Sequence, residues 1–252
     1  MNDVVRGVVL RGVKVKDSDL MLTVYTHERG LMSIYAAHVL KLRNLPASCT
    51  DFSYSEFVIK EKGDKIWRES SSCIRFFHDD SLSLEAFTVR TYVSEAIMHV
   101  GTAEPDAALM QLLLNTFHAA GTGKYDYRIL KAAFEVRLMS LIGFMPDLSA
   151  CSECGNSRGD FIFDIMSGTV RCIDCGEDAD EDDGRLHPTA ILSEGARVAF
   201  DYCVRCPADK LFSFTLSDED LRLFSRAAES YTVDQLDYEF ITLDYFRTIE
   251  NL

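Results

Sequence analysis

The sequence predicts an α+β protein in which a small closed β-barrel is followed by a helical domain that carries an inserted cysteine-bearing unit. Three observations lead to this prediction. Five short runs rich in β-branched and aromatic residues fill residues 4–71. Apolar residues at three- and four-residue steps replace that pattern from residue 82 onward. Two Cys-x-x-Cys pairs interrupt the helical part, and they enclose a short alternating segment.

The barrel is expected over residues 1–78. Composition and turn signals predict its five strands at residues 4–13, 20–26, 31–37, 52–61 and 65–71. Asp17-Ser18-Asp19, His27 to Gly30 and Lys62-Gly63-Asp64 supply the tight connections. A closed five-stranded barrel of the OB type is the common solution for five strands in about 70 residues.

The helical domain is expected in two parts, 79–147 and 188–252. Amphipathic periodicity predicts helices at 82–101, 104–121, 125–144, 188–203, 217–231 and 234–249. Asp126 is the predicted N-cap of the third helix, and Gly143 its stop. Ser217 with Asp220 approximates a capping box at the start of the fifth, and Pro188 is expected to open the fourth.

A zinc ribbon is expected over residues 148–187. Its ligands would be Cys151, Cys154, Cys172 and Cys175, because two Cys-x-x-Cys pairs at this separation are typical of a structural Zn²⁺ site. A glycine follows each pair, and the residues between them alternate like a hairpin with Ser167-Gly168 at its turn. Four thiolates would close the coordination sphere, so the metal is expected to hold structure and not to catalyse.

Other readings of the cysteines and acids remain open. The four thiols could be unpaired, or they could form two disulfides. Cys203 and Cys206 form a third pair with no partner pair, which favours free, partly buried thiols. The acidic run at residues 177–183 is expected to be a solvated loop, with a metal or basic-partner site as the alternative.

Composition limits the function classes. The chain has 252 residues and a net charge of −14, yet residues 1–75 carry 12 Lys/Arg against 9 Asp/Glu, whereas the rest carry 14 against 31. Any nucleic-acid contact should therefore concentrate in the first third. No export signal and no membrane-length apolar run is recognised, so a cytoplasmic protein without membrane contact is expected. No phosphate-binding glycine loop or hydrolase motif occurs, which argues against an enzyme.

The barrel is the predicted nucleic-acid interface. Cations that track a phosphate backbone, interleaved with aromatic rings that stack bases, are what a sequence-tolerant single-strand site needs. The candidate DNA-binding residues are Arg6, Arg11, Lys14, Lys16, Arg29, Lys41 and Arg43. Lys41 and Arg43, in the loop before Pro46, are the first choice for phosphate contacts. The alternative is that the aromatics are barrel core and the cations ordinary surface.

Three motifs resemble the bacterial recombination-mediator family RecO. Val9–Ala36 is similar to the family's opening strands, Tyr127–Gly155 to its central helix running into the first cysteine pair, and the second pair stands where zinc-bearing members have it. The resemblance implies a barrel that binds single- and double-stranded DNA and anneals strands. It also implies contacts with the acidic tail of the single-strand binding protein SSB and with RecR, so that RecA is loaded onto coated strands.

A place for the SSB tail can be sought on the third helix. An acidic peptide with an apolar end needs an apolar groove with a basic rim, and the helix carries Arg128, Lys131, Phe134, Arg137 and Leu138. The alternative is that Phe134 and Leu138 are core. A competing function is a zinc-ribbon adaptor that contacts only proteins. A metal hydrolase is a third hypothesis, and it would need an open coordination site.

Overall fold

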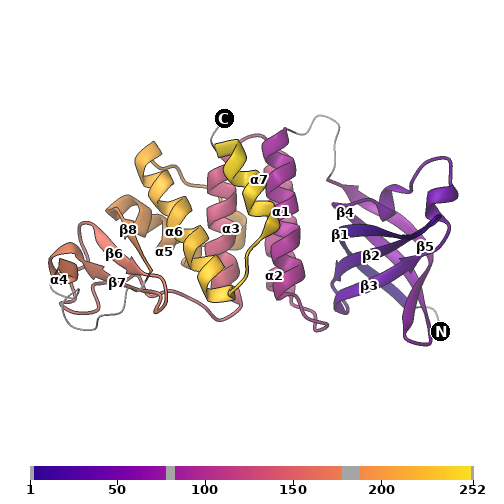
Figure 1. The fold of residues 1–252 in the computed structure, drawn as a ribbon, viewed down its shortest axis with the longest axis horizontal. Helices are drawn as coiled ribbons and strands as arrows, with labels where there is room; N and C mark the ends of the chain where they lie inside the picture. The colour runs from indigo at the N-terminus through magenta and orange to yellow at the C-terminus, as the bar shows by residue number, and fades with distance from the viewer. Residues whose placement is uncertain (1–2, 78–82, 178–187, 251–252) are drawn as a thin grey trace. The chain divides into compact units, whose positions relative to one another are not determined.

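The computed structural model describes residues 3–77, 83–177 and 188–250, which form two compact units (Figure 1). One unit contains residues 1–123 and 241–252, and the other contains residues 124–240. This division differs from the expected boundary at 78/79, because the first two helices and the last one group with the barrel. The acidic run at 177–183 lies almost entirely outside the described residues.

The barrel of the first unit has five strands, as predicted. They are β1 (Asp3–Lys16), β2 (Asp19–Thr26), β3 (Gly30–Ala36), β4 (Ser53–Lys62) and β5 (Lys65–Phe76). The closed order is β1-β2-β3-β5-β4, and a short parallel pairing of Ile34 and Tyr35 with Ile66 and Trp67 completes it. This strand order is that of an OB-like barrel.

The barrel core follows from the alternation of apolar residues along the strands. Val5, Val9, Leu22, Val24 and Ile34 are among the side chains that fill it, each at most 1% exposed. β-branched residues are favoured in a twisted, half-buried strand because their branched side chains pack well there. Register shifts between Val9/Arg11 and between Lys14/Lys16 bend β1, so that one long strand pairs with β2 and with β4.

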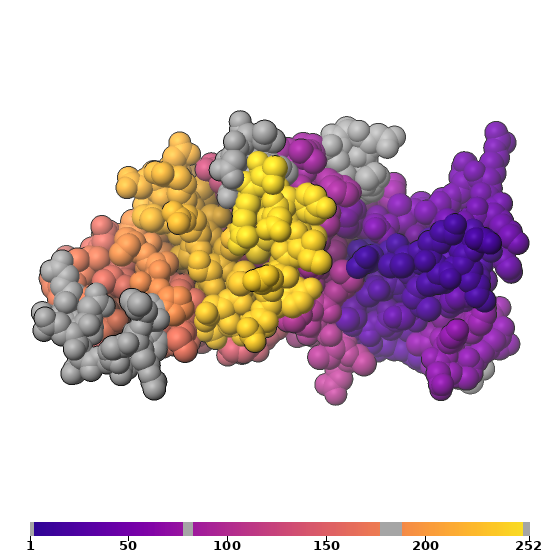
Figure 2. All heavy atoms as spheres, viewed as in Figure 1, coloured from indigo at the N-terminus to yellow at the C-terminus, as the bar shows by residue number. Residues whose placement is uncertain are grey.

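Three helices belong to the same unit as the barrel: α1 (Leu84–Val100), α2 (Ala107–Ala120) and α7 (Ile241–Glu250). Ser83 and Asp106 cap α1 and α2 by accepting backbone N–H bonds. The helix predicted at 234–249 begins only at Ile241, where the Glu95 carboxylate accepts the N–H groups of Ile241 and Thr242. Figure 2 shows α7, in yellow, at the surface of this unit.

The second unit combines helices with a small sheet. Its elements are α3 (Tyr127–Leu141), β6 (Phe161–Asp164), β7 (Thr169–Cys172), α4 (Ile173–Glu177), β8 (Thr189–Leu192), α5 (Glu194–Arg205) and α6 (Asp218–Leu236). Asp126 and Ser217 are N-caps as predicted. Phe163, Phe200 and Phe224 are fully buried between the sheet and the helices.

The prediction of a helix at 188–203 is wrong for its first residues. Residues 189–192 instead form strand β8, which pairs with β6 and makes a sheet of order β7-β6-β8. The helix begins after Ser193, whose hydroxyl accepts the N–H of Ala196. The ribbon sheet therefore extends past the expected boundary at residue 187. In the described part of the chain, no helix has the length and apolar character needed to cross a membrane.

Candidate functional site

Four cysteine sulfurs meet in the second unit. The Sγ atoms of Cys151, Cys154, Cys172 and Cys175 all lie within 4.8 Å of one another, and those of Cys154 and Cys172 are 3.7 Å apart. None of them forms a disulfide. A tetrahedral ion with Zn–S bonds of about 2.3 Å requires sulfurs about 3.8 Å apart. The cluster therefore has the dimensions of a four-thiolate metal site, and the disulfide alternative is wrong for this structure.

Local backbone geometry places these sulfurs. Cys151 and Cys154 lie on a turn in which the N–H of Gly155 donates to the Cys151 carbonyl, and Gly155 has a left-handed φ of +74°. Gly176, which follows the second cysteine pair, does not provide the tight turn that was expected of it. Gly176 is not left-handed; a Cβ there would meet Ile162 Cδ1 at 2.2 Å, so glycine allows α4 to approach β6 closely.

The thiols of the cluster lie in an environment that favours charge on one of them. Burial acts to raise the pKa of Cys151, but the backbone N–H groups of Cys154, Cys172 and Glu153 outweigh it and lower the pKa to about 6. The pKa of Cys175 is raised, first by hydrogen bonding with Cys172 and then with Cys154. A bound cation would favour the thiolate form at all four positions, because metal ligation requires deprotonated sulfur.

The predicted DNA-binding cations separate into two groups on the barrel. Arg29 is held by two acids, Asp3 at 2.5 Å and Glu61 at 2.6 Å. Arg6 lies 3.6 Å from Glu28, which also accepts the Arg6 backbone N–H. The charges of Arg6 and Arg29 are thus balanced within the barrel, where they tie β1, β4 and the β2–β3 hairpin together.

The other five candidates, Arg11, Lys14, Lys16, Lys41 and Arg43, form no ion pair among the described residues and are all exposed. We call these five residues the basic edge. The N–H of Leu40 donates to the Ser18 carbonyl at 3.0 Å, which anchors the loop with Lys41 and Arg43 beside the β1–β2 turn that follows Lys16. Apolar side chains alternate with the cations: Val13 is 42% exposed and Leu42 52%.

Most barrel aromatics are core, as the alternative hypothesis held. Tyr25, Tyr35, Phe52 and Phe57 are at most 5% exposed. Trp67 is half-buried and packs edge-on against Tyr35, with ring centroids 4.4 Å apart. The four buried rings cannot stack on bases, and the basic edge offers charge and aliphatic surface instead.

The prediction of a peptide groove on the third helix is wrong, because the helix's central side chains are buried. Lys131, Phe134 and Leu138 in α3 are 0% exposed, so they cannot form the surface of a peptide groove. Lys131 is ion-paired inside the protein with Glu135 of the same helix and with Glu229 of α6, at 3.0 and 2.7 Å. A charged residue on a helix is more often exposed, so its burial could not be read from spacing.

The two remaining cations of that helix also have internal partners. Arg128 pairs with Asp126 at 2.7 Å. Arg137 donates to the carbonyls of Cys203 and Cys206 at 2.7 and 2.6 Å, and to the Cys206 sulfur at 3.1 Å. Cys203 and Cys206 are free thiols, as predicted, but both are buried and not partly buried as expected. Burial raises the pKa of both. They therefore belong to the packing of α5 against α3.

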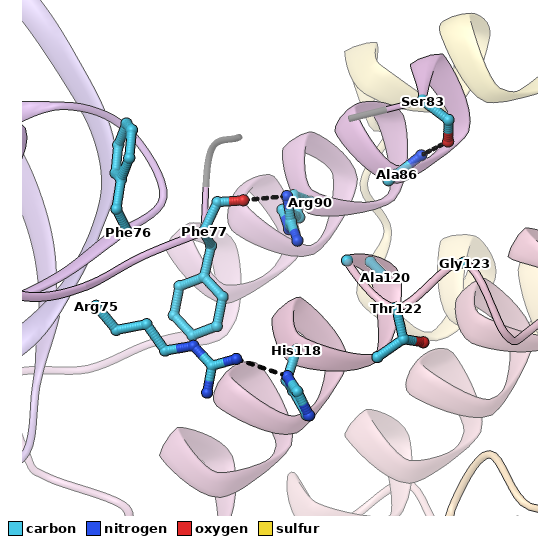
Figure 3. A pocket seen from close by; sticks show the side chains of 11 residues that line it. Arg75, Phe76, Phe77, Ser83, Ala86, Arg90, His118, Ala120, Thr122 and Gly123 are labelled. Carbon is cyan, nitrogen blue, oxygen red and sulfur yellow. Dashed lines mark hydrogen bonds between the residues drawn. The ribbon is translucent and has the colours of Figure 1, made fainter. Parts of the chain in front are cut away.

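The first unit also contains a cavity that no sequence motif indicates (Figure 3). It has a volume of about 450 Å³ and is lined by the end of β5, the start of α1 and the end of α2. Arg75, Arg90 and His118 face it from these three elements. Arg75 and His118 were unassigned in the sequence because neither stands in a motif. Only the tertiary fold brings them together.

Comparison with known proteins gives matches over nearly the whole chain. The family model described as recombination protein O N terminal matches residues 1–77, which cover the barrel. The model described as recombination protein O C terminal matches residues 81–239, which include α1 to α6 and the four-cysteine cluster. The two models thus meet close to the end of β5.

Individual relatives are similar at low identity and high coverage. The DNA repair protein RecO of Acetivibrio thermocellus is 28% identical over 250 residues, covering 98% of this chain and 96% of the relative. That of Rubrobacter xylanophilus is 28% identical over 204 residues, covering 74% and 80%. That of Listeria monocytogenes is 24% identical over 228 residues, covering 89% and 86%. The similarity extends over barrel, helices and ribbon alike.

Proposed function

Because the chain belongs to the recombination protein O family, whose role is in DNA repair and recombination, we propose that it is a non-catalytic recombination mediator. In this proposal the barrel binds single- and double-stranded DNA and anneals complementary strands. The protein then helps to load RecA onto single strands coated by SSB, together with RecR, in the bacterial cytoplasm. The acidic SSB tail and RecR are its proposed protein partners.

The observation that carries this proposal is the basic edge of the barrel. Its five cations form no ion pair among the described residues, although the whole chain has a net charge of −14. Binding to phosphates releases condensed counterions, so free cations on one edge favour a polyanion even when the rest of the protein is acidic. Arg6 and Arg29 are left out of the proposed contact set, because acids of the barrel already balance them.

The test is a salt titration of single-strand binding, followed by fluorescence anisotropy. The wild type should lose affinity linearly on a log–log plot, and the Lys14→Gln/Lys16→Gln variant should reduce the slope by about 0.7 for each lost contact. Lys60→Gln/Lys62→Gln on β4 is the control, since it removes the same charge from exposed positions outside the basic edge. Equal slopes for the two variants would remove the basic edge from the DNA site.

The competing proposal is an adaptor that contacts only proteins. The acidic balance of residues 76–252 favours it, because 31 acids there face 14 Lys/Arg and would repel a phosphate backbone. An adaptor would show no DNA binding at low salt, whereas a mediator would bind bare strands. Measuring the affinity for bare and for SSB-coated strands separates the two, since only the adaptor would need the protein coat.

For the metal, we propose Zn²⁺ held by Cys151, Cys154, Cys172 and Cys175. Thiolate sets of this kind select zinc among the common divalent ions of the cell. A closed four-sulfur site leaves no position for a reacting water, so the ion would fix the turn at Gly155 and the start of α4 to the ribbon sheet. The third hypothesis, a metal hydrolase, has no support in this geometry.

A further inference from the structure

The cavity of the first unit contains positive charge that no acid balances among the lining residues that the structure describes. Its side chains come from β5 (Arg75, Phe76), from the segment after it (Phe77) and from α1 and α2 (Arg90, His118). Among the residues that the structure describes, no carboxylate lines it. Figure 3 shows the Arg75 side chain directed toward His118, to which it is hydrogen-bonded at 2.8 Å.

Arg90 is the deepest of these groups. It is 2% exposed, and among the described residues its guanidinium donates to neutral acceptors, the backbone carbonyls of Phe77 and of Phe117. Burial lowers its pKa to about 10, and the nearby charge of Arg75 acts in the same direction. A buried guanidinium paired only with carbonyls keeps an unbalanced charge in a low-dielectric environment.

The second cation reinforces this imbalance. Both guanidinium groups lie against the Phe77 ring, with Arg75 at 4.9 Å and Arg90 at 5.9 Å from its centroid. The N-terminal end of α1 borders the same space through Ser83 and Ala86, and it adds the positive end of a helix dipole. Gly121 keeps the wall open, because a Cβ there would meet Arg90 Nη2 at 2.5 Å.

We propose that this cavity binds a phosphate group of a single-stranded nucleic acid, with Arg75 and His118 contacting it at the rim and Arg90 supplying the charge behind them. The proposal rests on the proposed function, which it extends from the basic edge to the far end of β5. A pair of arginines beside an imidazole is suited to phosphate, because guanidinium N–H groups match its oxygens. A volume of about 450 Å³ accommodates such a group with bridging water.

A nucleic-acid strand is favoured over an acidic peptide by the neighbour of Arg75. Phe76 lies on the last position of barrel strand β5, lines the cavity and is 42% exposed. A flat ring next to a phosphate site is the arrangement in which a base stacks while its phosphate is held. Continuity with the barrel points the same way, since β5 is one of its five strands.

Two variants test the proposal without disturbing the buried Arg90. Arg75→Gln removes an exposed cation from the rim. Ser83→Asp adds a carboxylate to the lining, and it preserves the start of α1 because aspartate is as good an N-cap as serine. Arg222→Gln is the control, since it makes the same one-unit charge change on the exposed face of α6 in the other unit. Thermal melting verifies that all variants fold.

The measurement is the anisotropy of a fluorescein-labelled oligo-dT of about 15 nucleotides over a range of NaCl concentrations. Arg75→Gln and Ser83→Asp should each weaken binding about tenfold at low salt, and should reduce the log–log slope by about 0.7, whereas Arg222→Gln should leave both unchanged. Replacing chloride with inorganic phosphate at equal ionic strength should compete with the oligonucleotide in the wild type and less in Arg75→Gln.

Four results would overturn the inference. If the wild type binds oligo-dT and both cavity variants match Arg222→Gln, the cavity is not a strand contact, while the proposed function stands. If inorganic phosphate competes but the cavity variants keep the wild-type slope, the site takes free phosphate only. If poly-glutamate binds the cavity more tightly than oligo-dT does, the occupant is an acidic peptide. Absence of any oligo-dT binding by the wild type would remove the proposed function as well.

Discussion

Lys131 Nζ lies 2.7 Å from Glu229 Oε2, and this ion pair joins α3 to α6 in the interior of the second unit. The same ammonium group lies 3.0 Å from Glu135, one turn further along α3. Lys131 and Glu135 are 0% exposed. Burial alone would lower the pKa of Lys131, but the two glutamates outweigh it and raise the pKa, so the lysine remains charged at neutral pH.

Lys131→Met should therefore destabilise the second unit, so that any loss of partner binding would follow from unfolding. The change removes the cation that faces two glutamates, and breaking a buried ion pair in this way costs roughly 3–5 kcal/mol. Lys210→Met, at a position that is 61% exposed beside Asp209, should cost less than about 0.5 kcal/mol. Urea unfolding of both variants gives the comparison. Equal midpoints would show that the Lys131 pair contributes no net stability.

The misplaced groove on α3 marks the limit of what the sequence could predict. Spacing placed Lys131, Phe134 and Leu138 on a helix correctly, but a single helix does not show which other element covers it. Glu229, the acid that makes burial of Lys131 tolerable, lies almost a hundred residues further along the chain, and no local pattern connects the two. The same limit applies to Arg90 and His118, which meet at one cavity only in the folded chain.

The barrel and the cysteine cluster were predictable because their signals are local. Alternation and turn residues placed all five strands, and the repeated Cys-x-x-Cys pattern placed all four sulfurs. Strand β8 was missed because Thr189–Leu192 is short and follows Pro188, which is equally typical of a helix start. Its pairing with β6 is a tertiary contact that the local sequence does not show. The helical pattern of the following residues therefore led to the prediction of a helix from residue 188.

Removing a cluster sulfur should release the metal and destabilise the ribbon. We expect the purified wild type to contain one Zn²⁺ per chain by elemental analysis. Cys154→Ser should lower the content well below one and the free energy of unfolding by several kcal/mol, because metal binding is coupled to local folding. Cys73→Ser is the matched control, since Cys73 is a free, exposed thiol on β5. A wild type purified without metal would contradict the assignment. So would a Cys154→Ser variant that melts at the same temperature as the wild type.

Acid should loosen the barrel through Asp19. This buried carboxylate accepts hydrogen bonds from the Tyr35 hydroxyl, the His38 backbone N–H and the Ser18 hydroxyl, and these bonds lower its pKa in that order of importance. Because the folded-state pKa lies below the unfolded value of about 3.9, the stabilisation is fully present above about 3.9 and is lost progressively as the pH falls from there through the lower, folded-state pKa.

The measurement is the melting temperature between about pH 7 and pH 2.5, which spans the unfolded pKa of aspartate. Asp19→Asn should melt lower than the wild type at neutral pH and should lose less on acidification, so the two curves converge. Asp17→Asn, in the exposed β1–β2 turn, should follow the wild-type curve. Parallel curves for wild type and Asp19→Asn would show that the hydrogen bonds to Asp19 do not depend on its charge.

The contact between the β2–β3 hairpin and the segment after α1 can be tested at one glycine. Gly30 has a left-handed φ of +58°, and a Cβ there would meet the Thr102 carbonyl oxygen at 2.3 Å and that of Glu104 at 2.5 Å. Leu31 N–H donates to the same Thr102 carbonyl at 2.7 Å. Glycine is needed at this position for two separate reasons, the backbone conformation and the close approach.

Gly63→Ala separates these two reasons. Gly63 has nearly the same φ, +61°, but its Cβ would meet nothing within 4 Å, so alanine there incurs only the left-handed backbone cost of about 1 kcal/mol. Gly30→Ala should cost this amount and about 1–3 kcal/mol more, because the backbone carbonyls must move to avoid the methyl group. Chemical unfolding monitored by Trp67 fluorescence gives the difference. If the two variants were equally stable, the hairpin would not pack against residues 102–104 in solution.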